Sequence, residues 1–326
     1  MTAAALHYHD AGSVELESGH VLSDVRQAYT LIGELNAARD NLVVVFHSLT
    51  ADADPLRWWG DVIGPGRAID TRRYAVLSAN LLGSCYGTTR VPDGVRVTPR
   101  DMARLTGRLV ETLEVPSVAL ATGGSLGGMV TLEWVACFPQ LTRAAVVFAA
   151  PAAHTAQAIG FGHIQRRAIE VGGVAGLEIA RMAAMMTYRT AAELESRFGR
   201  AQRDDGRYQV QSYLDHQGAK FVRRFDSAAY LTLLDAMDAH DVGRGRGGVG
   251  PALRAFTGEL VGVGITGDLL YEPETVQEWT AAARARYVEI ESVHGHDAFL
   301  LEPEQVGAIL RDALQRTQRA VPVEVG

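Results

Sequence analysis

A glycine-flanked serine constrains the fold of this chain more than any other feature. Ser125 stands in the run GGSLGG at positions 123–128, between a short apolar run at 117–122 and a segment at 129–134 with apolar residues at helical spacing. A G-x-S-x-G motif between a strand and a helix predicts a sharp, strained turn, because the glycines let both elements approach without Cβ clashes. We therefore expect the Oγ of Ser125 to be exposed at a sheet edge, beside a helix N-terminus that favours developing negative charge.

Two simpler interpretations compete with a nucleophilic serine. The motif could be a glycine-rich turn with an incidental serine, or it could be a phosphate-binding loop. A phosphate loop of the common type needs G-K-[ST] after its glycines, and the only lysine of this chain is Lys220. The motif favours a serine nucleophile if the chain also supplies a base and an acid.

Candidates for that base and acid follow later in the chain. A serine hydroxyl is a weak nucleophile near neutral pH, so it needs a histidine, whose tautomer is fixed by an acid. After an elbow of this kind the partners come in the order serine, acid, histidine. Asp268 follows the apolar run 260–266, and His296 follows the alternating run 287–293. Both lie just past a predicted strand, where ligands of open α/β sheets bind, so we predict a triad of Ser125, Asp268 and His296.

Longer motifs around these residues carry a family resemblance. The chain resembles the α/β-hydrolase-type homoserine O-acyltransferases of methionine biosynthesis, over nearly its whole length. The motifs are HSLT at 47–50, NLLGSCYGTT at 80–89, GGSLGGM at 123–129 and GHDAFL at 295–300, with further similarity at 158–161, 180–189, 213–226 and 236–238. They are more specific than the serine elbow, which many esterases share.

The resemblance implies a fold and an activity. The fold class is α/β: an α/β-hydrolase fold with a mostly parallel central sheet and an inserted helical lid domain. The activity is transfer of an acetyl group from acetyl-CoA to the hydroxyl of L-homoserine, through an acyl-serine and with ping-pong kinetics, in methionine biosynthesis. Three alternatives stay open: a succinyl donor, a serine acceptor, and a serine hydrolase or esterase of the same fold.

The resemblance also implies an oxyanion hole. One donor is the backbone N–H at the position matching Leu49, and the other is the N–H of Leu126, the residue after the nucleophile. The family more often has alanine and glycine where this chain has Ser48 and Ala51. We interpret His47, at the start of the same loop, as a structural histidine.

Four positions match the acceptor pocket of the family. Arg181 matches the lid arginine that meets the amino-acid carboxylate, Tyr188 a nearby tyrosine, and Asp297 the acid that receives the amino group, while Thr50 is assigned to the same pocket. From the residues alone, Arg181 could be a surface arginine, Tyr188 a packed aromatic and Asp297 a helix cap. The loop after Thr89 is shorter than in many members, which leaves the donor preference open.

Composition excludes several other classes of function. The chain has 326 residues, 47% of them hydrophobic, and a net charge of −7, which provides no basic field for nucleic acid and no polybasic membrane anchor. No run approaches the ~20 apolar residues of a membrane-spanning helix, and residues 1–10 lack a signal-peptide pattern. We therefore predict a cytoplasmic enzyme.

Neither a metal nor a cofactor is expected. The two cysteines, Cys85 and Cys137, do not make a disulfide framework. The chain has no C-x-x-C or H-E-x-x-H motif, and its two H-x-H pairs lack further ligands nearby. Acetyl-CoA and L-homoserine are the expected small-molecule partners, with acetyl-CoA as a co-substrate.

The pattern along the chain predicts three segments. Residues 1–150 and 249–326 form the two parts of the core, and residues 151–248, rich in helical runs, form the lid, through which we expect a homodimer. Residues 14–33 alternate like antiparallel β structure at a sheet edge. The glycine- and arginine-rich tract at 243–248 is interpreted as a flexible return from lid to core rather than an RNA-binding segment.

Overall fold

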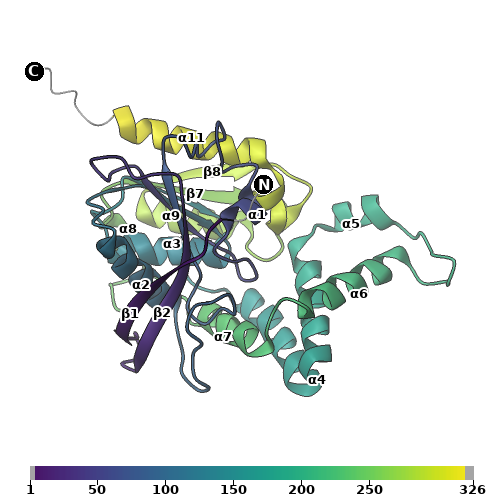
Figure 1. Cartoon of the computed structure of the whole chain (residues 1–326). Helices are drawn as coiled ribbons and strands as arrows, with labels where there is room; N and C mark the ends of the chain where they lie inside the picture. Colours follow the sequence, from purple (N-terminus) through teal and green to yellow (C-terminus); the bar gives the residue numbers. More distant parts are fainter. Residues whose placement is uncertain (1–3, 320–326) are drawn as a thin grey trace, which may run out of the picture.

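A single twisted sheet forms the centre of the computed structural model, which describes residues 4–319 (Figure 1). Within these residues the sheet has eight strands in the order β1-β2-β4-β3-β5-β6-β7-β8. The strands are β1 (His7–Glu15), β2 (Val21–Ile32), β3 (Leu42–Phe46), β4 (Ala75–Ala79), β5 (Val118–Gly124), β6 (Ala144–Phe148), β7 (Glu259–Ile265) and β8 (Arg286–Ile290). The strands from β3 to β8 pair in parallel, while β2 pairs antiparallel with both β1 and β4. The predicted mostly parallel sheet is confirmed.

The N-terminal β structure differs from the expectation of one stretch at 14–33. A hairpin occupies this region: β1 begins at His7, and the chain turns between Leu16 and His20 before β2. Most side chains of β1 are exposed, so its sequence lacks the strong apolar alternation that marks a strand. The expected stretch merged the end of β1, the turn and β2.

Each face of the sheet carries its own apolar core. Alternate residues of β3 serve both, since Val44 packs in the core that includes helices α2, α3 and α9, and Val43 in the core that includes α1, α10 and α11. This explains the continuous apolar strands, because strands covered on both faces need no polar positions. The core helices are α1 (Pro55–Trp59), α2 (Pro99–Thr112), α3 (Leu126–Cys137), α8 (Val249–Arg254), α9 (Pro273–Ala283), α10 (Ala298–Leu301) and α11 (Pro303–Arg319).

Helix α2 begins with a reciprocal N-terminal cap. Thr98 accepts a hydrogen bond from the N–H of Asp101, the Asp101 carboxylate accepts one from the N–H of Thr98, and Pro99 takes the first helical position. This reciprocal capping satisfies N–H groups that a helix start otherwise leaves unpaired. Among residues 4–319, no helix is long and apolar enough to span a membrane.

The segment between β6 and β7 forms the helical lid. Its helices are α4 (Ala156–Tyr188), α5 (Ala191–Phe198), α6 (Gln209–Val222) and α7 (Ser227–Asp238). Gly173 has φ 56° and ψ −123° and breaks α4 into two helical halves, a backbone conformation that glycine adopts readily. In Figure 1, α5 and α6 extend away from the sheet. The boundaries at 151 and 248 stay predictions, and residues 1–3 and 320–326 of the predicted core segments lie outside the described residues.

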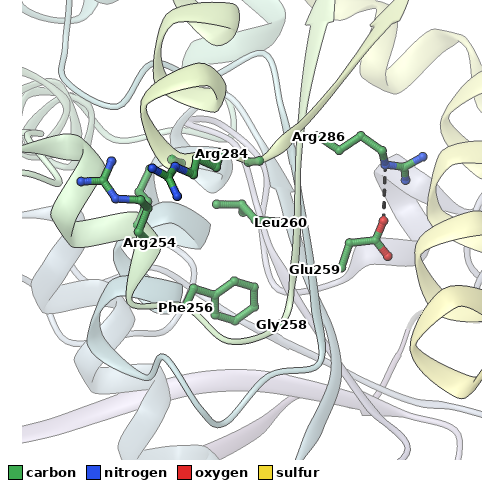
Figure 2. A pocket seen from close by; sticks show the side chains of 10 residues that line it. Arg254, Phe256, Gly258, Glu259, Leu260, Arg284 and Arg286 are labelled. Carbon is green, nitrogen blue, oxygen red and sulfur yellow. Dashed lines mark ion pairs between the residues drawn. The ribbon is translucent and has the colours of Figure 1, made fainter. Parts of the chain in front are cut away.

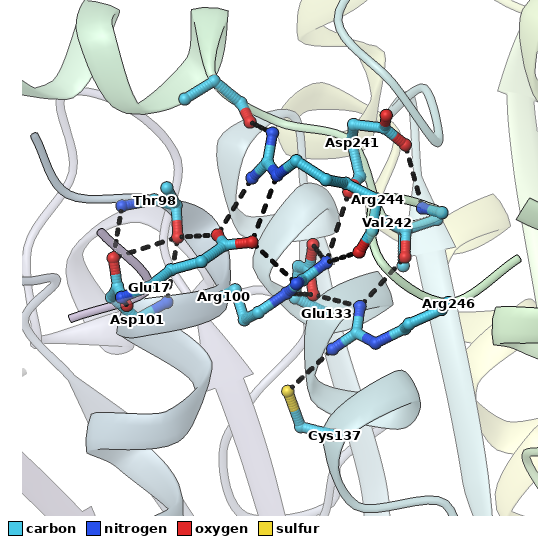
Figure 3. A network of polar contacts seen from close by, with 12 residues as sticks. Glu17, Thr98, Arg100, Asp101, Glu133, Cys137, Asp241, Val242, Arg244 and Arg246 are labelled. Carbon is cyan, nitrogen blue, oxygen red and sulfur yellow. Dashed lines mark hydrogen bonds and ion pairs between the residues drawn. The ribbon is translucent and has the colours of Figure 1, made fainter. Parts of the chain in front are cut away.

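The return from lid to core is anchored rather than flexible. Figure 3 shows its two arginines in a polar network: Arg244 pairs with Glu17 at 2.9 Å, and Arg246 pairs with Glu133 at 2.6 Å. The Glu133 side chain is 1% exposed, so its charge depends on such partners. The prediction of a flexible return at 243–248 was wrong, because its arginines bind carboxylates of the core.

Candidate active site

The turn after β5 has the geometry of a nucleophile elbow. Ser125 has φ 59° and ψ −126°, a strained conformation for a residue with a side chain. A Cβ placed on Gly123 would lie 2.5 Å from the carbonyl oxygen of Gly127 and 2.7 Å from that of Phe46, and a Cβ on Gly127 would also meet the Phe46 carbonyl. Both glycines are therefore required sterically. The Ser125 N–H donates to the carbonyl of Phe148 at 3.0 Å, which ties the turn to β6.

The predicted acid and histidine form a buried pair at the same sheet edge. Asp268 follows β7 and His296 follows β8, and Nδ1 of His296 lies 2.7 Å from Oδ2 of Asp268. The other oxygen, Oδ1, accepts the N–H groups of Leu270 at 2.8 Å and Tyr271 at 3.0 Å. The carboxylate only accepts, so Nδ1 carries the proton and Nε2 is left as the basic nitrogen. The pair has the orientation that a serine's base requires.

Electrostatics keep this histidine basic. Burial lowers the pKa of His296, but the charge and hydrogen bond of Asp268, together with the charge of Asp297, raise the pKa above its usual value. Among the described residues, Nε2 of His296 has no hydrogen-bond partner, so no bond to the hydroxyl of Ser125 is formed in this state. The free Nε2 is available to accept a proton.

One small cavity brings the predicted residues together. Its volume is about 100 Å³, and it is lined by Ser48, Leu49, Thr50, Ser125, Arg181, Tyr188, His296, Asp297, Phe299 and Leu300. Asp268 lies behind His296, and Leu126 follows Ser125. Ser125 is only 5% exposed, which differs from the expected open position, because lid residues cover the sheet edge.

The two expected oxyanion donors come from two different elements next to the cavity. Leu126 is the first residue of α3, where a helical N–H has no partner within the helix. Leu49 lines the cavity from the loop after β3. His47 holds that loop, since its Nδ1–H donates to the Ser48 carbonyl at 2.8 Å and its Nε2 accepts the Leu81 N–H at 3.0 Å. Both ring nitrogens are used, which fits a structural histidine.

A lid arginine supplies positive charge to the cavity. The guanidinium of Arg181 lies over the rings of Tyr188 at 5.7 Å and Phe221 at 5.2 Å, and among the described residues it forms no ion pair. Tyr188 in turn packs against the ring of His296, with centroids 5.6 Å apart. Burial raises the pKa of Tyr188, so its hydroxyl stays neutral. An anionic group entering the cavity would find Arg181 unpaired.

A larger cavity elsewhere lacks this chemistry. Figure 2 shows it at the N-terminal ends of β7 and β8, with a volume of about 490 Å³ and with Arg254, Phe256 and Arg284 among its lining residues. None of the predicted site residues lines it. Parallel sheets bind substrates at the carboxyl ends of their strands, so the smaller cavity is the candidate active site.

Comparison with known proteins agrees with this geometry. Residues 41–303 match the family described as alpha/beta hydrolase fold. A homoserine O-acetyltransferase of Thermus thermophilus is 43% identical over 336 residues, which cover 90% of this chain and 87% of the relative. The chain belongs to the homoserine O-acetyltransferase family.

Solved structures of similar proteins carry the same fold. The homoserine O-acetyltransferase from Staphylococcus aureus is 30% identical to this family member, with a TM-score of 0.83 and 95% of each chain covered. The acetyl esterase MekB is 22% identical, with a TM-score of 0.86 and coverage of 96% of this chain and 97% of MekB. At 22% identity, the similarity to MekB shows a shared fold and carries no conclusion about activity.

In this member of the homoserine O-acetyltransferase family, Asp297 has an ion-pair partner, Arg189, that was not predicted from the sequence. Arg189, just after α4, lies 3.1 Å from Asp297 and 2.8 Å from Glu193 of α5. Burial raises the pKa of the Asp297 carboxyl, although Arg189 opposes that shift. The i,i+4 spacing of Arg189 and Glu193 is a sequence signal for their pairing. Nothing in the sequence shows that the pair meets Asp297.

Proposed function

We propose that the protein is a homoserine O-acetyltransferase that uses acetyl-CoA as donor and L-homoserine as acceptor. One observation carries the proposal: the cavity that holds Ser125 and the His296 base also presents the unpaired cation Arg181 and the carboxylate of Asp297. An esterase needs only the first pair. An amino-acid acceptor needs the second as well, because its carboxylate and ammonium must both be bound.

The first half-reaction makes an acyl-enzyme. His296 Nε2 takes the proton of Ser125 while Oγ attacks the thioester carbonyl of acetyl-CoA. The N–H groups of Leu49 and Leu126 stabilise the tetrahedral oxyanion. The carbon–sulfur bond then breaks, CoA leaves as a thiol with the proton from His296, and Asp268 stabilises the imidazolium during this step.

The second half-reaction discharges the acyl group. His296 takes the proton of the homoserine hydroxyl, the alkoxide oxygen attacks the acyl carbon, and the Ser125 ester breaks as His296 returns the proton to Oγ. A cavity of about 100 Å³ at Ser125 leaves little room for both the CoA sulfur and the acceptor hydroxyl at one acyl carbon. The proposal therefore includes ping-pong kinetics, with no cofactor beyond the co-substrate.

Acceptor and donor choice follow from the same cavity. Arg181 receives the α-carboxylate of homoserine, Asp297 the ammonium, and Tyr188 and Thr50 complete the wall. The small volume beside Ser125 accommodates acetyl better than succinyl, whose extra carboxylate would need a second cation. We place the reaction in methionine biosynthesis, as the family resemblance implies, and keep the cytoplasm as the predicted compartment.

The proposal extends to a homodimer through the lid. Four apolar side chains of α4 are more than half exposed: Ile164 59%, Val171 80%, Val174 65% and Ile179 55%. Exposed apolar side chains gathered on one helix indicate a surface that associates with another molecule. A second copy of the same helix matches it in chemistry, since closed twofold contacts bring identical patches together.

A donor-by-acceptor matrix tests the proposed activity. Acetyl-CoA or succinyl-CoA is combined with L-homoserine, L-serine or no acceptor, and thiol release and ester product are both measured. We expect rapid O-acetylhomoserine formation from acetyl-CoA with homoserine. Without acceptor we expect a burst of about one thiol per enzyme followed by slow steady-state thiol release. Equal steady-state thiol release with and without homoserine, with acetate as the product, would make the protein a hydrolase.

A further inference from the structure

A hydrogen-bond chain outside the cavity joins the lid to the catalytic pair. His154, in the loop between β6 and α4, has a side chain 3% exposed. Its Nδ1 lies 3.2 Å from Oδ1 of Asp238, the last residue of α7, and its Nε2 lies 3.1 Å from the hydroxyl oxygen of Tyr271. Asp238 also accepts a hydrogen bond from Arg166 of α4 at 3.1 Å.

The chemistry of these groups sets the direction of the hydrogen bonds. The Asp238 carboxylate only accepts, so Nδ1 of His154 carries the proton and donates it. In the neutral ring Nε2 is then an acceptor, and the Tyr271 hydroxyl donates to it. Burial, with the nearby Asp268 charge adding to it, raises the pKa of Tyr271 well above its usual value, so the phenol keeps its proton.

Tyr271 connects this chain to the proposed base. Its ring packs edge-on against the ring of His296, with centroids 5.4 Å apart and planes at 69°. Its backbone N–H donates to Oδ1 of Asp268 at 3.0 Å. The side chain is buried, 1% exposed, and it contacts both members of the pair without lining the cavity.

We propose that Tyr271, His154 and Asp238 are positioning residues for the His296–Asp268 pair. The inference rests on the proposed function, because it assumes that His296 is the base. The hydroxyl of Tyr271 is held by His154, His154 is held by Asp238, and the tyrosine ring thereby fixes the tilt of His296. None of the three touches substrate; each acts through the imidazole.

The lid supplies this support, so it orients the base as well as covering the cavity. Asp238 ends α7, and its second partner, Arg166, belongs to α4. A separate contact from α4 holds the same loop, because the side-chain amide of Gln157 donates to the Leu269 carbonyl at 2.8 Å. The loop that carries Asp268 is thus held by lid residues at two points.

A matched pair of substitutions separates this role from general support of the lid. Asp235 and Asp238 lie one turn apart on α7 and both pair with Arg166, but only Asp238 contacts His154. In Asp238→Asn the guanidinium of Arg166, which only donates, takes the amide oxygen, so the amide NH2 faces Nδ1 of His154. Donation from this NH2 moves the ring proton to Nε2 and leaves the Tyr271 hydroxyl without an acceptor. We expect kcat to fall by about 10-fold to 100-fold, as small misplacements of catalytic groups do, with KM unchanged.

Both half-reactions should slow together, since His296 serves each. Asp235→Asn, which removes a carboxylate from the same arginine, should keep the wild-type kcat. Tyr271→Phe, which removes only the hydroxyl, should slow the enzyme as Asp238→Asn does. The double variant should be no slower than either single variant, because both changes break one chain.

Proton NMR of the Nδ1–H of His296 reports on the position of this ring without any catalytic turnover. The Nδ1–H of His296, bonded to a carboxylate, gives a downfield signal that is assigned by its loss in Asp268→Asn. The signal should shift in Asp238→Asn and Tyr271→Phe and stay in place in Asp235→Asn. Equal kcat losses for the two aspartate variants, multiplied losses in the double variant, or an unmoved signal in Asp238→Asn would overturn the inference. A wild-type protein that forms no acyl-enzyme would instead refute the proposed function and leave the resonance test intact.

Discussion

Replacing Arg181 by alanine should separate the two half-reactions of the proposed mechanism. The guanidinium lines the cavity beside Ser125, lies over the rings of Tyr188 and Phe221 and, among the described residues, forms no ion pair. Because none of the described carboxylates neutralises Arg181, its positive charge is available for the α-carboxylate of homoserine. The acetyl group of the donor is uncharged and does not need this arginine.

The magnitude follows from the loss of one charge-assisted contact. Such hydrogen bonds contribute about 1.5–3 kcal/mol, so kcat/KM for homoserine should fall by about 10-fold to 150-fold in Arg181→Ala. Arg181→Lys should recover part of this loss, because an ammonium restores the charge but not the planar two-point contact. Acylation of Ser125 by acetyl-CoA should proceed at the wild-type rate in both variants.

Rapid-quench measurement of the two half-reactions provides the assay. Acylation is followed as the CoA burst without acceptor, and discharge as loss of the acyl-enzyme on addition of homoserine. The control is Arg167→Ala on the same helix, since Arg167 is 59% exposed and pairs with Glu170 outside the cavity. Equal damage to both half-reactions in Arg181→Ala, or damage to neither, would remove Arg181 from the acceptor site.

Three further predictions concern pH and association. Burial lowers the pKa of His296, but Asp268 and Asp297 together raise it above its usual value of 6.5. Acylation should therefore fall as the pH drops through this raised pKa, and stopped-flow CoA release should show that acidic limb at lower pH in Asp268→Asn. Burial lowers the pKa of His240 to about 3, so between pH 6.5 and about 3 this side chain binds a proton in the unfolded chain but not in the folded chain. As the pH is lowered through that window, the free energy of unfolding should fall by up to about 1.4 kcal/mol per pH unit. Urea titrations should show a shallower pH slope for His240→Gln, and an unchanged slope would contradict this assignment. Val171→Asp combined with Val174→Asp should convert a dimer to a monomer in sedimentation, whereas a wild-type monomer would exclude the lid interface.

The elbow and the acid–histidine pair could be predicted because their signals are local. Gly123 and Gly127 are required by contacts within one turn and with the adjacent strand, and the motif states that requirement directly. Asp268 and His296 each follow an apolar strand, so their places at one sheet edge follow from parallel pairing alone. The 2.7 Å contact between them is what two neighbouring strand ends allow.

Contacts between distant segments could not be predicted. Arg189 meets Asp297, and Tyr271 meets His154, through loops that are far apart in sequence. The local sequence pattern predicts whether a residue lies in a helix, a strand or a loop. It does not predict which distant loop that element packs against. The tract at 243–248 shows the same limit: its glycine and arginine content resembled a flexible linker, and its anchoring depends on Glu17 and Glu133, which are distant in sequence.

The covalent state of Ser125 during turnover is the most direct test of the acyl-serine mechanism. Purified protein is mixed with acetyl-CoA without acceptor, quenched, and digested for mass spectrometry, with Ser125→Ala treated in parallel. We predict one acetyl group on Ser125 of the wild type, its rapid loss on addition of L-homoserine with formation of O-acetylhomoserine, and no adduct in Ser125→Ala. An acetyl group on Cys85 with full activity in Ser125→Ala, or product formation without any acyl-enzyme, would contradict the acyl-serine mechanism.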